Sequence, residues 1–229
     1  MPRSAEVEAV FSALGGLFLT PAAELAARLA GIRGIVLDWD GVFSQGAKGE
    51  GVTSTFSEAD SMGTNLLRFA LWRARGALPV AALITGEDNP TARRFAAREH
   101  FHAVFAGAKD KRVALEALCA AFGVEARALV CVFDDVNDLG MAARCGVRIL
   151  VRRAASPLLK DYAARRDLCD YITAAEAGAY PVREAAELLL GLMGVFDDVV
   201  QARSEWAPDY VEYFAARQAV ETQLLGAPQ

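Results

Sequence analysis

Short apolar runs alternate with helical patterns along most of the chain, and this alternation predicts the fold. Apolar runs typical of buried strands span residues 32–38, 78–84, 103–105, 128–133 and 147–151. Between them, apolar positions recur at helical spacing over 61–75, 90–100, 109–122 and 137–145. Strands that alternate with helices indicate a parallel sheet with helices on both faces. We therefore predict an α/β fold with a doubly wound, Rossmann-like parallel sheet.

One segment interrupts this rhythm directly after the first predicted strand. Residues 44–56 contain three glycines, and Val52, Ser54 and Phe56 then occupy alternate positions. We predict a short β-hairpin flap here, with a disordered loop as the alternative. Neither this segment nor the connection between the second and third strands is long enough for a large cap domain.

Both ends of the chain are predicted to be helical extensions of this α/β domain. We assign residues 1–30 to an N-terminal extension, 31–193 to the α/β domain and 194–229 to a C-terminal extension. The first segment resembles a signal peptide in its apolar run, but Glu6 and Glu8 stand where a basic region belongs, which favours a helix. Beyond residue 151 we expect only helices, including 181–193 and 209–225.

The composition excludes several classes of partner. The chain has 229 residues, 54% of them hydrophobic, which is enough to bury a sizeable core. A net charge of −5 and a pI near 5.2 argue against nucleic acid, because phosphate backbones bind to basic surfaces. No apolar run reaches membrane-spanning length, so we expect no membrane partner. The four cysteines lack CxxC spacing, so we expect reduced thiols and a cytoplasmic protein.

The chemistry is first indicated by the sequence Asp38-Trp39-Asp40-Gly41, which ends the first predicted strand. Side chains alternate along a strand, so both carboxylates should point to the same side. Two carboxylates held that close repel each other unless a cation lies between them. Gly41 allows a sharp turn that leaves this side open. A metal site with a carboxylate nucleophile explains the arrangement, whereas packing does not.

Three further predicted elements bring polar residues to the same edge of the sheet. Thr85-Gly86 follows the second strand, and Lys111 opens the helix after the third. The fourth strand is followed by three acids, Asp134, Asp135 and Asp138. Each has an ordinary alternative as a turn, a solvated lysine or acids at a helix N-terminus. Together, at the carboxyl ends of parallel strands, they predict a Mg²⁺ site that binds and transfers a phosphoryl group.

The order Asp-x-Asp-Gly, Thr-Gly, Lys, Asp-Asp-x-x-Asp resembles the haloacid-dehalogenase superfamily of phosphohydrolases, over residues 32–190. The short flap in place of a cap is similar to the capless branch that includes the 3-deoxy-D-manno-octulosonate 8-phosphate phosphatases. The segment 107–111 resembles that branch's Gly-x-x-Asp-Lys and selects Lys111 over Lys109 as the motif lysine. Residues 179–184 resemble its C-terminal helix start.

This resemblance implies a role for each matching residue. Asp38 would be the nucleophile that forms an aspartyl-phosphate, and Asp40 would protonate the leaving oxygen and then activate water. Asp38, the backbone carbonyl of Asp40 and Asp134 would hold Mg²⁺. Thr85, Gly86 through its backbone N–H, and Lys111 would bind the phosphate.

The remaining acids and the substrate are less fully defined by the resemblance. Asp135 and Asp138 would support the metal site or hold Lys111. Glu87 stands where the sugar-acid phosphatases have arginine, and an acid there would repel a substrate carboxylate. We expect a phosphomonoesterase that acts on a small phosphorylated sugar or sugar acid.

Two other functions are kept open as alternatives, and one assembly is predicted. A catalytically silent assembly protein is disfavoured by the complete set of acids and lysine. A phospho-acceptor signalling module is disfavoured because its acidic pair precedes the acceptor, whereas here Asp38 precedes the pair at 134–135. The resemblance implies a homotetramer in which one subunit's flap closes its neighbour's site.

Overall fold

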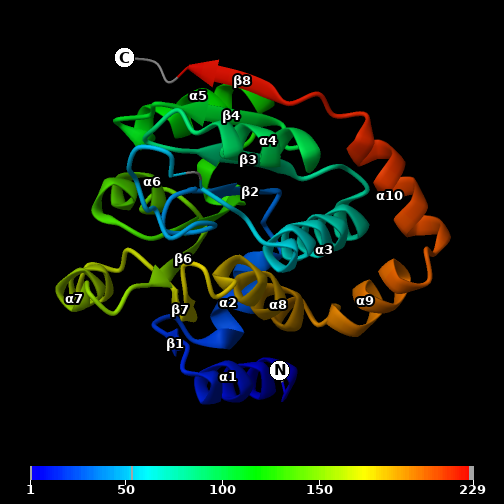
Figure 1. Cartoon of the computed structure of the whole chain (residues 1–229). Helices are drawn as coiled ribbons and strands as arrows, with labels where there is room; N and C mark the ends of the chain where they lie inside the picture. Colours follow the sequence, from blue (N-terminus) through cyan, green and yellow to red (C-terminus); the bar gives the residue numbers. More distant parts are fainter. Residues whose placement is uncertain (1, 53, 227–229) are drawn as a thin grey trace.

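The computed structural model describes residues 2–52 and 54–226, which form a mostly parallel sheet between layers of helices (Figure 1). The eight strands lie in the order β1-β7-β6-β5-β2-β3-β4-β8. Their bounds are β1 Leu17–Phe18, β2 Gly34–Leu37, β3 Val80–Ile84, β4 Ala103–Ala106, β5 Leu129–Phe133, β6 Val147–Arg152, β7 Tyr171–Glu176 and β8 Gln223–Gly226. Every pair of neighbours is parallel except β1 with β7. The predicted doubly wound α/β sheet is confirmed, and no separate cap domain is seen in the described residues.

Helices connect the strands and cover both faces of the sheet. Their bounds are α1 Pro2–Leu14, α2 Ala22–Leu29, α3 Glu58–Arg75, α4 Pro90–Arg98, α5 Lys111–Phe122, α6 Leu139–Ala142, α7 Pro157–Arg165, α8 Pro181–Met193, α9 Phe196–Ser204 and α10 Pro208–Gln218. Local sequence sets several of their starts. The side chains of Ser57, Asn89 and Asp110 accept hydrogen bonds from the first turns of α3, α4 and α5, where backbone N–H groups lack helical partners.

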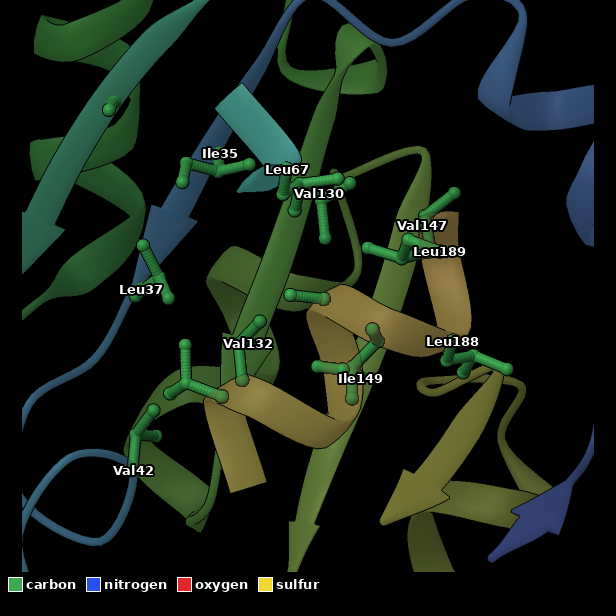
Figure 2. Packing of buried hydrophobic residues seen from close by; sticks show 14 of the residues in the cluster. Ile35, Leu37, Val42, Leu67, Val130, Val132, Val147, Ile149, Leu188 and Leu189 are labelled. Carbon is green, nitrogen blue, oxygen red and sulfur yellow. The ribbon is translucent and has the colours of Figure 1, made fainter. Parts of the chain in front are cut away.

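The core is divided by the sheet, because successive residues of a strand point to opposite faces. Figure 2 shows alternate residues of β2, β5 and β6 on the face that packs against α8. They are Ile35, Leu37, Val130, Val132, Val147 and Ile149, which meet Leu188 and Leu189 of α8 and Leu67 of α3. The residues between them, such as Val36 and Cys131, pack on the other face with α5 and α6. Burial on both faces explains why these strands are continuously apolar.

The predicted β-hairpin flap at 44–56 does not form, which corrects the sequence interpretation. The segment is an irregular loop in its described residues, with a single bridge between Asp40 and Ser44 at its start. Gly46 and Gly51 adopt positive φ angles, which break the extended backbone. Polar groups expected to stand outward instead bond to the chain, since Ser54 accepts a hydrogen bond from Trp39. We call residues 41–57 the active-site loop.

The sequence predicts two purely helical ends, but the structure shows a strand in each of them. Residues 17–18 form β1 and residues 223–226 form β8, so each end adds a strand to an edge of the sheet (Figure 1). The helix expected over 209–225 ends at Gln218, and β7 interrupts the helices expected after residue 151. The pattern missed β1 and β8 because these short edge strands bury few side chains.

Two further expectations concern membranes and cysteines. Among the residues that the structure describes, none of the helices combines the length and apolar character needed to cross a bilayer. All four cysteines are free thiols, and Cys131, Cys145 and Cys169 are buried in the core. They therefore serve as packing residues, as the spacing predicted.

Candidate active site

The polar residues predicted from the strand ends line one cavity of about 510 Å³ at the carboxyl edge of the sheet. The predicted residues that line it are Asp38, Asp40, Thr85, Gly86, Lys111, Asp134 and Asp135. Parallel strands end together at this edge, which is where open α/β sheets bind ligands. Asp138 is completely buried behind the cavity. The topology thus brings together residues that are up to 100 positions apart in the chain (38 to 138).

Lys111 forms the buried centre of the site. It is only 1% exposed, and its Nζ lies 2.5 Å from Asp38 Oδ1 and also donates to Asp138 Oδ1. The first turn of α5 places it there, because Asp110 caps the helix one residue earlier. Lys109 is exposed and donates to the carbonyl of Gly86 instead. The structure therefore puts Lys111, rather than Lys109, beside the predicted nucleophile.

Burial strongly shifts the pKa values of the acids in the cavity. Burial, followed by repulsion from Asp138, raises the pKa of Asp38 to about 6, although Lys111 opposes this. Burial and the charges of Asp38 and Asp138 raise the pKa of Asp134 to about 8. Burial opposes the charge of Lys111, but the two carboxylates outweigh it and raise the Lys111 pKa above its ordinary value. The cluster holds more negative charge than its lysine balances.

This surplus of negative charge fits a divalent cation. Oxygen atoms of Asp38, Asp134 and Asp138 lie within 4.8 Å of one another, and all three residues are buried. Asp138 is already occupied, since Oδ1 accepts from Lys111 and Oδ2 from the backbone N–H of Asp135 at 3.2 Å. Asp38 and Asp134 therefore offer the available carboxylate oxygens. Hard oxygen ligands of this kind suit Mg²⁺.

Gly41 is what lets Asp134 approach the end of β2. Its φ is +93°, and a Cβ atom added there would lie 2.0 Å from Asp134 Oδ2. Any side chain at this position would push Asp134 away from Asp38. The turn predicted at Gly41 thus has a second use, which is to make room for a carboxylate from the neighbouring strand β5.

Asp40 faces away from the buried acids, toward the mouth of the cavity. Its Oδ1 accepts from the Ser44 hydroxyl at 3.1 Å, and its Oδ2 lies 2.9 Å from Nζ of Lys48. Its carboxylate is therefore not part of the metal cluster, which leaves its backbone carbonyl as the predicted ligand. Across the cavity, Thr85 is buried with its backbone bonded to β4 and to Ala108.

Asp135 and Asp138 also form the helix cap that was the ordinary alternative for them. Asp135 Oδ1 accepts from the N–H of Val136 at 2.7 Å, and Asp138 accepts in return from Asp135. This reciprocal cap orients Asp138 toward Lys111. The same two residues thus form the helix cap and, through Asp138, contact Lys111.

Sequence reasoning missed two cations at the mouth of the cavity. Arg153 follows β6 and pairs with both Asp134 and Asp135, the second at 2.6 Å. Lys48, from the active-site loop, pairs with Asp40. The sequence did contain a signal for Arg153, because this residue follows the fifth predicted strand, and parallel strands end at the same edge of the sheet. Lys48 had none, since the loop's path over the site does not follow from its sequence.

The fold, the acidic strand ends and the buried lysine are similar to those of the phosphatases of the haloacid-dehalogenase superfamily. Comparisons with known proteins agree with this similarity. No protein-family model matches the chain. It is similar to the 3-deoxy-D-manno-octulosonate 8-phosphate phosphatase KdsC of Haemophilus influenzae. The two are 29% identical over 178 residues, which cover 74% of this chain and 91% of that protein.

Solved structures show the same likeness. The 3-deoxy-D-manno-octulosonate 8-phosphate phosphatase of Moraxella catarrhalis, in complex with magnesium, phosphate and KDO, has 27% identity and a TM-score of 0.65. That alignment covers 78% of this chain and 97% of the other. The cobalt-bound phosphatase of Haemophilus influenzae has 26% identity and a TM-score of 0.61, covering 74% and 95%. A magnesium ion in a similar structure agrees with the acidic cluster described above.

Proposed function

We propose that the chain is a Mg²⁺-dependent phosphomonoesterase that hydrolyses a small phosphorylated sugar or sugar acid through an aspartyl-phosphate. The observation that carries this proposal is the contact between Asp38 and buried Lys111 at the end of β2. A carboxylate held by a lysine beside an acidic cluster is suited to attack a phosphoryl group whose charge is neutralised. The similar phosphatases named above support a sugar phosphate as the substrate class.

We assign the roles that the resemblance implies, and the positions of the side chains support them. An oxygen of Asp38 forms a bond to phosphorus as the bond from phosphorus to the leaving oxygen breaks. Asp40, at the mouth, gives that oxygen a proton. A water molecule then attacks phosphorus while Asp40 takes its proton, and the bond to Asp38 breaks to release phosphate. Lys111 and Thr85 bind the phosphoryl oxygens throughout.

Asp38, Asp134 and the backbone carbonyl of Asp40 would hold the metal ion. When bound, Mg²⁺ supplies positive charge that offsets repulsion between the phosphate and the carboxylates. Asp135 and Asp138 keep this arrangement in place, because Asp138 fixes Lys111 and Asp135 fixes Asp138.

The proposal is tested by replacing the nucleophile. Asp38→Asn should abolish Mg²⁺-dependent hydrolysis of p-nitrophenyl phosphate, because an amide is a poor nucleophile. The fold should survive, since the change removes one charge from a repelling cluster. Asp161→Asn, at an exposed position of α7, is the matched control and should keep wild-type turnover.

A chemical readout separates the intermediate from simple activity loss. With a ³²P-labelled sugar phosphate and acid quenching, wild-type protein should retain label and Asp38→Asn should not. Near-native turnover in Asp38→Asn would show that another residue is the nucleophile.

Cytoplasmic location and homotetrameric assembly remain predictions from the sequence, and the free thiols are consistent with a cytoplasmic location.

A further inference from the structure

A second cavity opens beside the catalytic one, and the two share three charged residues. The catalytic cavity contains Asp38, and the second, of about 300 Å³, lies between the active-site loop and the start of α4. Asp40, Lys48 and Glu87 line both. A substrate with its phosphoryl group at Asp38 and its leaving oxygen beside Asp40 would have the second cavity open to its leaving group.

The wall of this second cavity belongs to the same chain and is fixed by specific bonds. Trp39 Nε1 donates to Ser54 Oγ at 3.1 Å, and the Ser54 hydroxyl lies 3.0 Å from Asn89 Oδ1 at the start of α4. The Trp39 ring is completely buried and stacks on Phe43 with centroids 5.0 Å apart. These contacts hold the active-site loop beside the catalytic cavity, so Lys48 reaches this cavity within one chain.

Lys48 stands where the leaving group must pass. Its Nζ lies 2.9 Å from Asp40 Oδ2 and 3.4 Å from an oxygen of Glu87. Asp40 has to reach the leaving oxygen to protonate it, so a bound substrate takes the place of the ammonium beside Asp40. Lys48 then keeps Glu87 as its partner and faces the substrate atoms next to the phosphoester.

The charges around the second cavity are already paired. Glu87 and Asp40 compensate Lys48, and Asp88 is compensated by Arg93. An anionic leaving group would find no unpaired cation among the described residues that line this cavity. Hydroxyl groups, in contrast, would find hydrogen-bonding side chains at Ser54, Asn89 and Thr91, which also line it.

We propose that Lys48 and Glu87 form a specificity-determining pair, which selects substrates with a neutral, hydroxyl-rich leaving group over those that carry a carboxylate. The negative charge of Glu87 neutralises the positive charge of Lys48, and Glu87 also repels a substrate anion. The inference rests on the proposed function, because it names the substrate class of the same site. Both side chains are more than half exposed, so their replacement should leave the stability of the fold nearly unchanged.

The test uses two competing ligands that differ by one carboxylate. Glucitol 6-phosphate and 6-phosphogluconate, which are both open chains, are titrated as competitors of Mg²⁺-dependent p-nitrophenyl phosphate hydrolysis. Wild-type protein should bind the neutral sugar phosphate more tightly. Glu87→Gln should raise the relative affinity for 6-phosphogluconate by about tenfold, because a released Lys48 pairs with the carboxylate. Adding Lys48→Gln to Glu87→Gln should remove that gain.

Glu125→Gln is the matched control, since it makes the same substitution at an exposed carboxylate that pairs with Arg127 and lines neither cavity. It should leave the ratio of affinities unchanged. An equal shift in Glu125→Gln, an unchanged ratio in Glu87→Gln, or tighter binding of 6-phosphogluconate by wild type would each overturn the inference. A wild-type protein that fails to hydrolyse p-nitrophenyl phosphate would instead remove the proposed function and this inference with it.

Discussion

Buried carboxylates decide the behaviour of this site at the scale of single residues. Asp38, Asp134 and Asp138 are each less than 5% exposed, and Lys111 is the buried cation beside them. Arg153 pairs with Asp134 from the rim, but its side chain is 38% exposed and reaches only one of the three. Removing such carboxylates from water favours their protonated forms unless a further cation arrives. Protons and metal ions should therefore compete for the same oxygens.

This competition predicts how stability depends on pH. The pKa values of Asp38 and Asp134 in the folded protein are about 6 and about 8, above the unfolded value of about 3.9. Between about pH 4 and about pH 8 the folded state binds more protons than the unfolded state. The metal-free protein should therefore lose stability as pH rises through this window, and Mg²⁺ should restore it by binding the folded state. Melting temperatures measured in EDTA and in Mg²⁺ across the window test this.

Asp134→Asn is the variant that checks the cause. It removes the group with the larger pKa shift, so its melting temperature in EDTA should fall less with pH. It should also lose most of the stabilisation by Mg²⁺. Wild-type curves that run parallel with and without Mg²⁺ would contradict a metal site at these residues.

The turn after β2 is the element on which the site depends most. Gly41 and Gly76 both have positive φ angles, of +93° and +67°. An added Cβ at Gly41 meets Asp134, whereas at Gly76 it meets nothing within 4 Å. Both alanine variants should lose about 1 kcal/mol or somewhat more of stability from left-handed backbone strain. Gly41 is thus constrained by its backbone and by its neighbour, and Gly76 by its backbone alone.

Comparing these two variants separates backbone strain from damage to the site. Gly41→Ala should abolish Mg²⁺-dependent hydrolysis of p-nitrophenyl phosphate, and Gly76→Ala should keep it. Chemical denaturation measures the stability loss of each, and a Mg²⁺ titration of the melting temperature measures metal binding. If Gly41→Ala binds Mg²⁺ and turns over substrate as Gly76→Ala does, the close approach of Asp134 has no functional role.

How far the sequence predicts these elements depends on whether each one is buried. The central strands and the residues at their ends were predicted because apolar runs and polar ends mark parallel strands clearly. The hairpin prediction failed because the alternation from Val52 to Phe56 reflects contacts with Trp39 and α4, not strand pairing. Lys48 was missed for the same reason. Its position depends on tertiary contacts of the active-site loop, which no local pattern encodes.

At the scale of the whole molecule, the two ends of the chain close around the sheet. Phe11 of α1 packs edge-on against Tyr171 of β7, with ring centroids 6.4 Å apart. At the opposite edge, β8 pairs with β4, and buried Arg217 of α10 lies 3.2 Å from Glu99. The extensions assigned from the sequence are therefore integrated with the central sheet. They also carry the apolar surface that bears on assembly.

The exposed apolar surface of α1 and β1 indicates where the subunits of the predicted homotetramer would contact each other. Val10, Leu14 and Leu17 are 64%, 63% and 41% exposed on α1 and β1, next to a groove of about 260 Å³ between α1, α8 and α9. Apolar side chains line this groove together with three carboxylates, Glu6, Glu187 and Asp197. Neighbouring exposed apolar side chains of this kind mark contact surfaces between subunits. We expect light scattering to show a tetramer, and Val10→Asp with Leu14→Asp to dissociate it. Leu158→Asp, at an 80% exposed position of α7, is the control and should leave the assembly intact.

Catalysis should not depend on assembly in this protein, because the active-site loop lies beside the catalytic cavity of its own chain. Trp39, Ser54 and Asn89 fix that loop within one chain, so no second subunit is needed to place Lys48. The dissociated Val10→Asp, Leu14→Asp variant should therefore keep Mg²⁺-dependent hydrolysis of p-nitrophenyl phosphate within about threefold of wild type, a difference of less than about 1 kcal/mol in barrier height. A wild-type particle of 24.5 kDa would contradict the tetramer. Loss of turnover on dissociation would instead show that a neighbouring subunit completes the site.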